Sequence, residues 1–332
     1  MTRNETVATE PTARFLFPVL AIGVVAIFAA SLAIGPSGLG LPAGQGAAWL
    51  VLVEIRLPRA ILGLLIGAGL GLSGAVLQGY LRNPLAEPGL IGVSGGASLG
   101  AVLALHTGLS ATVPLALPLG GLAGAGIATL GVLLLAGPQT GTLTLILAGI
   151  AISTVATALT TLALNLAPNP FAAVEIVFWL MGSLTDRSLA HVWLAAPFIL
   201  AGMGLLLTLG RAVDALTLGE DAAANLGLDL SRMRMIMIAG LALTVGASAA
   251  VAGTIAFVGL IVPHVLRPLV AAQPGRLLPA SLLGGAILVL GADTLLRVIA
   301  PLADVKLGVV TALVGAPFFL WLVVKTRSTL PR

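Results

Sequence analysis

Long apolar runs alternate along the chain with short connections that are polar or rich in glycine and proline. A membrane-spanning helix needs about 20 mostly apolar residues. The pattern predicts an all-α integral membrane protein with ten transmembrane helices in one domain that covers residues 1–332. The expected spans are residues 15–34, 59–80, 90–105, 114–136, 142–166 and 190–209, two within 235–267, then 276–297 and 307–324.

The stretch RNPLAEPGLIGVSGGASLG, Arg82 to Gly100, interrupts this pattern between two strongly apolar segments. It carries prolines, glycines and one acid. Irregular backbone at membrane depth is tolerated only where protein or water covers it, because lipid cannot satisfy free N–H and C=O groups. The stretch is either an ordinary interhelical turn or a broken helix beside a transport pathway. Its shape alone does not separate the two.

A second break follows the seventh span. Residues 235–262 carry no charge and are too long for one helix, and Gly253, Gly259 and Pro263 divide them. Ten spans form two halves of five, and an odd number inverts the second half relative to the first. The two breaks then occupy equivalent places, which is the sequence sign of a transporter built from inverted repeats.

Composition supports a polytopic membrane protein. The chain is 58% hydrophobic and only 8% charged, with a mean hydropathy of +1.14, whereas a soluble domain carries about 25% charge. A cytoplasmic N-terminus, with residues 1–14 as a cytoplasmic tail, places most of the 16 Lys and Arg residues inside, as the positive-inside rule requires. This topology also places the C-terminus in the cytoplasm. The basic residues that remain outside are Arg56, Arg59, Arg187, Arg297 and Lys306.

Signals for catalysis or metal binding are poor. The three histidines, His106, His191 and His264, are too dispersed for a metalloprotease motif, and there is no cysteine. No Gly-Lys-Ser/Thr sequence occurs, so another chain must bind ATP if ATP drives this protein. Scattered basic residues and few aromatics argue against nucleic-acid binding. An intramembrane enzyme is therefore disfavoured.

Asp293 is the one acid inside an apolar span. A charge at the bilayer centre costs at least about 2.5–3.5 kcal/mol, so such residues are usually functional or paired. Arg297 follows four residues later and can pair with Asp293 on one helix face. We expect a structural ion pair. The alternative is an ion-coupled secondary transporter that uses Asp293.

Residues 210–234 form the most polar internal stretch. Within it, residues 214–228 can form two short helices, with Gly219 between them and Gly227 as a C-terminal stop. Glu220 and Asp221 suit a helix N-terminus. Ala222 to Ala224 would give a flat face for another protein. Taken alone, the stretch could equally be a solvated loop.

Several long motifs together resemble one known family, the FecCD/BtuC-like permease subunits of the iron-siderophore, haem and vitamin B12 ABC importers of type II. The resemblance covers nearly the whole chain. The motifs are RLPRAILGLLIGAGLGLSGAVLQGYLRNPLAEPGLIGVSGGASLGA at 56–101, FWLMGSL at 178–184, LTLGEDAAANLGLD at 216–229, VAGTIAFVGLIVPHVLR at 251–267 and LGVVTALVGAPFFLWLV at 307–323.

The resemblance implies a permease subunit in a bacterial inner membrane, without its own ATPase site. Its partners would be a second permease subunit, in a homodimer, two cytoplasmic ATP-binding subunits and an extracytoplasmic substrate-binding protein. ATP and magnesium would be used by the partner ATPase, and this chain would bind neither cofactor nor metal. The cargo would be a metal chelate, most commonly an iron(III)-siderophore, with haem and cobalamin close behind.

The resemblance also assigns roles to residues. Coupling to the ATPase falls on Leu218, Gly219, Glu220, Asp221, Ala222, Ala223, Leu226 and Gly227 within 214–228. The inner gate falls on Asn83, Leu85, Thr142 and Leu143, and docking of the binding protein on Arg56, Arg59 and Arg297. Helical spacing on the fifth span suggests Ser153, Thr157, Thr160 and Thr161 as pathway lining.

Overall fold

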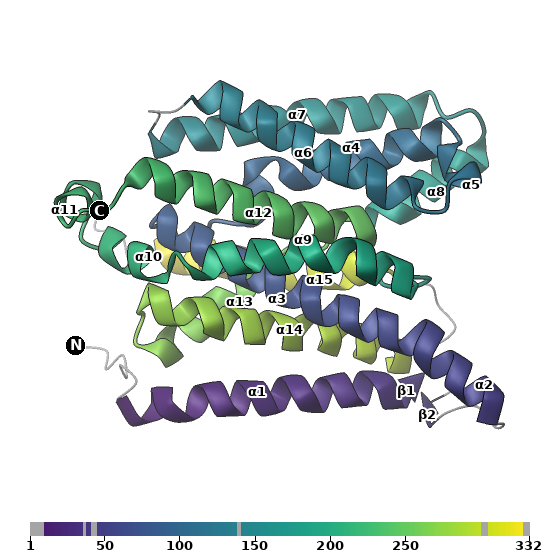
Figure 1. Cartoon of the computed structure of the whole chain (residues 1–332), viewed down its shortest axis with the longest axis horizontal. Helices are drawn as coiled ribbons and strands as arrows, with labels where there is room; N and C mark the ends of the chain where they lie inside the picture. The colour runs from purple at the N-terminus through teal and green to yellow at the C-terminus, as the bar shows by residue number, and fades with distance from the viewer. Residues whose placement is uncertain (1–9, 36–37, 41–44, 138–140, 300–304, 328–332) are drawn as a thin grey trace.

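The structure is a computed structural model that describes residues 10–35, 38–40, 45–137, 141–299 and 305–327. Most helices run alongside one another in a bundle (Figure 1). The long elements are α1 (Glu10–Ala33), α3 (Leu57–Tyr80), α6 (Ala116–Ala136), α7 (Thr142–Asn165), α9 (Leu189–Leu207), α12 (Leu230–Ala252), α14 (Pro274–Ile299) and α15 (Leu307–Arg327). The short elements are α2 (Gln45–Leu50), α4 (Val93–His106), α5 (Leu109–Thr112), α8 (Pro170–Leu180), α10 (Gly210–Leu216), α11 (Glu220–Asn225) and α13 (Val258–Leu266).

Eight helices of the described residues are long and apolar enough to cross a membrane, and three shorter apolar helices accompany them. Two of these three, α4 and α13, occupy the predicted third and eighth spans. Together with the eight long helices they give the ten expected spans and confirm the fold class. The third, α8, is the short helix that follows α7.

The predicted boundaries differ at the N-terminal end of the chain. Helix α1 already begins at Glu10, within the predicted tail, and residues 1–9 of that tail lie outside the described residues. The second span also starts earlier than expected, because α2 and the π-helix η1 (Val51–Arg56) continue directly into α3. Two residue pairs, β1 (Ile34–Gly35) and β2 (Gly38–Leu39), form an antiparallel ribbon that hydropathy does not predict.

Small residues bring the central helices into backbone contact, as expected where lipid provides no hydrophobic drive to association. A Cβ atom added at Gly67 of α3 would overlap the carbonyl group of Gly285 on α14. A Cβ at Gly100 of α4 would overlap the carbonyl group of Gly120 on α6 in the same way. These glycines therefore allow close packing of α3 on α14 and of α4 on α6.

The two breaks have matching designs. The first break, residues 82–92, ends at Gly92, which has φ +83° and caps α4; the second break, residues 253–257, ends at Phe257, which has φ +67° and caps α13. Each break packs against a glycine in the last membrane span of its own half of the chain. Gly149 of α7 makes room for the carbonyl group of Leu90, and Gly315 of α15 makes room for Phe257. These paired contacts support the inverted repeat.

The two ends of the bundle carry different short elements (Figure 1). At one end, which we call the inner end, lie the start of α1 and the short helices α10 and α11. At the opposite, outer end lie α2, the β-ribbon, α5 and α8. This arrangement places the polar segment 214–228 on the same side as the start of α1, as the charge pattern predicts.

Candidate transport pathway and coupling site

An open hollow of about 380 Å³ lies between α4 and α7. All four residues that helical spacing suggests as pathway lining are on its wall. None of the described residues that line it carries a charge. Its hydroxyl-bearing residues are Ser94, Ser98, Ser153, Thr157, Thr160, Thr161 and Thr254.

Two hydroxyl groups on the wall of the hollow, those of Thr157 and Thr161, are satisfied within α7 itself. Thr157 donates to the carbonyl oxygen of Ser153 at 2.8 Å, and Thr161 donates to that of Thr157 at 2.9 Å. Hydroxyls bound in this way keep an acceptor lone pair free. Ser98 of α4 is buried and its hydroxyl has no hydrogen-bond partner in the described part of the chain. The hollow therefore offers weak, uncharged hydrogen bonds.

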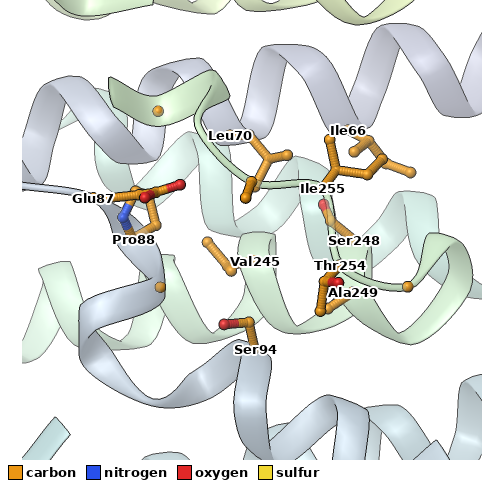
Figure 2. Close-up of a pocket in the computed structure, with 14 residues that line it drawn as sticks. Ile66, Leu70, Glu87, Pro88, Ser94, Val245, Ser248, Ala249, Thr254 and Ile255 are labelled. Carbon is orange, nitrogen blue, oxygen red and sulfur yellow. The ribbon is translucent and has the colours of Figure 1, made fainter. Parts of the chain in front are cut away.

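A second, more enclosed cavity of about 150 Å³ is lined by residues of both breaks (Figure 2). Glu87 and Pro88 of the first break lie on one side of it, and Thr254 and Ile255 belong to the second break. Helices α3 and α12 complete the wall. An Oε1 atom of Glu87 accepts a hydrogen bond from the backbone N–H of Phe257 at 2.5 Å. The first break thus caps the helix that follows the second break.

Gln78, near the end of α3, makes further contacts between the two halves. Its Nε2 atom donates to the carbonyl oxygens of Gly259 at 3.3 Å and Ala86 at 3.4 Å, and its Oε1 atom accepts from Arg267 at 2.7 Å. Pro88 packs directly on Gly259, because a Cβ there would lie 2.6 Å from the proline ring. The breaks are therefore held together by side chains of α3 and of the first break.

Burial raises the pKa of Glu87 above its ordinary value of 4.5, and the hydrogen bond from Phe257 acts in the opposite direction. Burial is the larger cause, because removal from water disfavours the charged carboxylate. The dipole of α13 favours a negative charge at this position.

The predicted inner-gate residues lie at the inner end. Asn83 forms a local turn in which its Oδ1 atom accepts from the backbone N–H of Leu85 at 2.9 Å. Thr142 begins α7, and its hydroxyl donates to Glu220 of α11 at 3.4 Å. Leu143 beside it is 69% exposed. Residues 138–140 before α7 lie outside the described residues. The gating role of the four residues stays a prediction.

Two short helices form in the predicted coupling segment, with Gly219 between them, and Gly227 has φ +87° after the second. The first helix begins at Gly210, four residues before the expected start. Glu220 also lies 3.7 Å from Arg82, so one carboxylate contacts the starts of both gate segments. Leu218 and Leu226 are 67% and 66% exposed and flank α11.

One detail of the coupling prediction is wrong. Ala223 is fully buried within its own chain, so it does not belong to a flat exposed face with Ala222 and Ala224. It instead anchors α11 to the bundle. Asp214 anchors α10 in a similar way, because its carboxylate accepts from the backbone N–H of Gly275 at 2.7 Å.

The outer arginines are not exposed charges. Arg56 is 4% exposed, and its guanidinium donates to the carbonyl oxygens of Leu32, Ala33 and Gly40. Asp293 is 1% exposed and pairs with Arg59 at 2.8 Å and with Arg297 at 3.0 Å. The expected pair of Asp293 with Arg297 is confirmed and gains Arg59 as a third member. Burial of Arg56 and Arg297 counts against direct docking of a binding protein on these two side chains.

Sequence reasoning missed the contacts between the breaks. Glu87 appeared only as an acid in an irregular stretch, and neither Gln78 nor Phe257 was singled out. An acid directly before a proline, between two apolar spans, is a signal that could have found Glu87. Nothing in the sequence indicates that its partner is a backbone amide 170 residues later.

The fold and the site define a class of protein: a multi-pass membrane permease subunit with paired broken helices, a hollow without charged lining residues in the described part of the chain, and an exposed helical segment at one end. The FecCD transport family model matches residues 16–325. The chain belongs to the FecCD transport family.

Relatives of known function are similar over most of the chain. The vitamin B12 import system permease protein BtuC of Citrobacter koseri is 39% identical over 82% of this chain and 83% of that protein. The cobalamin import system permease protein BtuC of Halobacterium salinarum is 40% identical over 83% of this chain and 73% of its own length. BtuC of Escherichia coli is 39% identical over 89% of this chain and 88% of its own length.

The fold also matches a solved structure, which is described as an inward-facing conformation of a metal-chelate type ABC transporter. The TM-score is 0.85 at 34% sequence identity, and the match covers 94% of this chain and 99% of the other. The chain is therefore a permease subunit of an ABC importer for metal chelates, without its own ATPase domain. No cofactor is expected for it, and ATPase and binding-protein partners are implied. The alternative of a secondary transporter driven through Asp293 does not agree with this family.

Proposed function

We propose that this permease imports a cobalamin-type chelate, as a homodimer with two cytoplasmic ATP-binding subunits and an extracytoplasmic binding protein. The family resemblance alone implies an iron(III)-siderophore as the commonest cargo. The relatives described above favour cobalamin, since each is a vitamin B12 or cobalamin importer. The cytoplasmic position of both chain termini is part of the same proposal.

The hollow between α4 and α7 is the observation that supports transport of a bulky, hydrogen-bonding chelate most directly. Its hydroxyls can contact amide and phosphate groups of a passing molecule, and no charged side chain among its described lining residues can retain that molecule. A pathway must release what it receives, so weak contacts suit it better than tight ones.

The inner end supports the coupling role. In the proposed cycle, Leu218 and Leu226 enter a recess of the ATP-binding subunit, and Glu220 transmits movement of α11 to Arg82 and Thr142. Asn83, Leu85, Thr142 and Leu143 then open or close the inner end of the hollow. The remaining proposed contacts to the ATPase come from Gly219, Asp221, Ala222 and Gly227.

At the outer end, docking through Arg56, Arg59 and Arg297 is proposed in a revised form. Arg56 and Arg297 bind backbone oxygens of residues 31–40 and so hold the end of α1 and the β-ribbon in place. Arg59 is more accessible, with 16% of its side chain exposed. The arginines would thus shape the docking surface and contribute little direct contact.

Uptake in a deletion strain tests the cargo. Cells that lack the chain should lose ATP-dependent uptake of labelled cyanocobalamin and regain it with the chain, whereas uptake of labelled ferric siderophores should be unaffected. The opposite result would replace cobalamin with a siderophore as the cargo. Loss of neither would contradict the proposed function.

Two variants of α7 test the pathway. Thr157→Phe fills the hollow and should reduce uptake, because a large ring narrows the path of a bulky chelate. Thr154→Phe is the matched control, since Thr154 is on the same helix and does not line the hollow. Equal loss in both variants, at equal membrane abundance, would argue that the hollow is not the pathway.

A further inference from the structure

A continuous series of contacts joins the inner end to the outer end through the two breaks. It begins at Glu220 of α11, which lies 3.7 Å from Arg82. Arg82 is itself the first residue of the first break and has φ +48°, a conformation that is unusual for a residue other than glycine. Movement of α11 therefore acts directly on the beginning of the first break.

Glu87 carries the series into the second half of the chain. Its carboxylate holds the amide of Phe257, which also has a left-handed conformation and caps α13. Such conformations persist only where surrounding contacts impose them. Glu87 lines the cavity on the side of the first break (Figure 2). It is the residue of the first break that bonds to the amide of Phe257. Loss of the carboxylate would free Phe257 to relax.

Beyond Phe257, the second break reaches the outer end. The hydroxyl of Thr254 donates to the carbonyl oxygen of Leu180 at the end of α8, and Ser183 donates its N–H to Ala252 at 2.7 Å. The N–H of Gly308, at the start of α15, donates to the carbonyl oxygen of Gly182. The second break is therefore bonded through Thr254 to the end of α8, at the outer end of the bundle where a binding protein would dock.

We propose that Glu87 is a positioning residue that couples the two breaks, so that docking at the outer end and ATP binding at the inner end bias the same two-state element. The proposal rests on the proposed function, because it needs a binding protein and an ATPase at opposite ends. The cavity beside Glu87 provides space for the breaks to move relative to each other. Spatial continuity alone does not demonstrate coupling, so the test must measure it.

The test uses the assembled complex in lipid nanodiscs and compares basal ATPase activity with the activity stimulated by loaded binding protein. Glu87→Ala removes the acceptor and should lower the stimulation about fivefold or more, the scale of ordinary coupling between sites. Glu87→Gln keeps an acceptor oxygen and should retain most of it. Ser248→Ala is the matched control, because Ser248 lines the same cavity and its hydroxyl donates within α12.

Hydrogen exchange supplies a readout that does not depend on activity. The amide of Phe257 should exchange faster in Glu87→Ala than in the wild type, and Glu87→Gln should restore the slow rate. If Glu87→Ala does not assemble, a comparison of wild type with Glu87→Gln and Arg82→Ala still tests the link. Arg82→Ala should then speed exchange at Phe257, although Arg82 contacts Glu220 and Phe257 contacts Glu87, so the two residues do not share a partner.

Three results would overturn the proposal without contradicting the proposed function. The first is full stimulation in Glu87→Ala, and the second is unchanged exchange at Phe257 in both Glu87→Ala and Arg82→Ala. A wild-type complex that shows no stimulation at all would instead contradict the proposed function, and the proposal with it. Reduced basal activity in Glu87→Ala, together with an unchanged stimulation ratio, would show a merely structural role and would also overturn the coupling.

Discussion

The outer and inner ends of the molecule use charge in opposite ways. At the outer end, Asp293 and Arg297 are almost fully buried and Arg59 is partly buried, with ion-pair distances of 2.8 and 3.0 Å. At the inner end, Arg82 and Glu220 are each 49% exposed and 3.7 Å apart. The first set joins two helices, α3 and α14, that lie far apart in sequence. The second joins a loop to a short surface helix.

This difference separates a fixed end from a movable end. Buried ion pairs are costly to break, because a remaining charge is left without solvent or partner. Exposed pairs contribute about 0–1 kcal/mol and can exchange partners readily. An importer needs both properties: a stable outer platform on which a binding protein docks, and an inner contact that changes during each ATPase cycle.

Asp293→Asn should have the largest effect on stability. The change leaves Arg59 and Arg297 buried without a counter-charge, which typically costs about 3–5 kcal/mol. Thermal unfolding of the purified chain in nanodiscs should show a clearly lowered Tm. The matched control is Glu175→Gln on α8, since Glu175 is exposed at the same end of the bundle. An Asp293→Asn protein as stable as the control would show that the outer cluster is not a fixed platform.

Gly315→Ala should have the next largest effect and lies between the two ends. The added Cβ would overlap the Cβ and ring of Phe257, so the second break must shift. Overpacking of this kind costs about 1–3 kcal/mol. Gly126→Ala on α6 is the control, because nothing lies within 4 Å of a Cβ at that position. Equal Tm values for the two variants would argue that the second break adapts freely.

Much of the fold could be predicted from hydropathy. Eight long runs and two short ones at equivalent places give the ten spans, because lipid forces each apolar run into a helix of definite length. The helix boundaries were harder to predict from hydropathy. The continuous helix from Gln45 to Tyr80 begins well before the predicted second span, in a mostly apolar stretch that carries the charges of Glu54 and Arg56.

The site could be predicted where helical periodicity decides the matter. Ser153, Thr157, Thr160 and Thr161 recur at intervals of three and four and therefore share a face of α7. The burial of the outer arginines could not be predicted in this way. A charge near a helix end is equally compatible with solvent and with partners, and the partners of Arg56 are carbonyl groups of residues 16 to 24 positions away. The partner of Glu87 could not be predicted for the same reason, because it is a backbone amide 170 residues later in the chain.

Glu220→Arg should change stability little and coupling strongly. The exposed contact to Arg82 contributes at most about 1 kcal/mol, so Tm should fall only slightly. Binding-protein-stimulated ATPase activity should fall markedly, because like charges then face each other across the coupling contact. The exchange variant, Arg82→Glu with Glu220→Arg, should recover part of the stimulation. Arg82→Glu with Asp221→Arg is the control, because Asp221 forms no ion pair with Arg82 in the described part of the chain, so this combination should recover no stimulation.

If the exchange variant recovers nothing, the contact between Arg82 and Glu220 is not what transmits movement of α11. A fall in Tm as large as that of Asp293→Asn would contradict the distinction between the two ends. That result would mean that the inner contact is as fixed as the outer cluster.

The smallest expected effect is the pH dependence that Glu87 contributes. Burial raises its pKa in the folded protein above the ordinary value of 4.5, so the folded chain holds this proton at pH values where the unfolded chain has lost it. The contribution of Glu87 to stability is therefore fully present below about pH 4.5 and is lost as pH rises through the raised pKa. Thermal unfolding can be measured from about pH 4 to about pH 8, a range that covers the loss of this proton. The Tm of the wild type should fall relative to that of Glu87→Gln as pH increases. A relative rise would mean that the hydrogen bond from Phe257 and the dipole of α13 outweigh burial, so that the junction of the breaks favours the charged carboxylate and behaves electrostatically like the outer end.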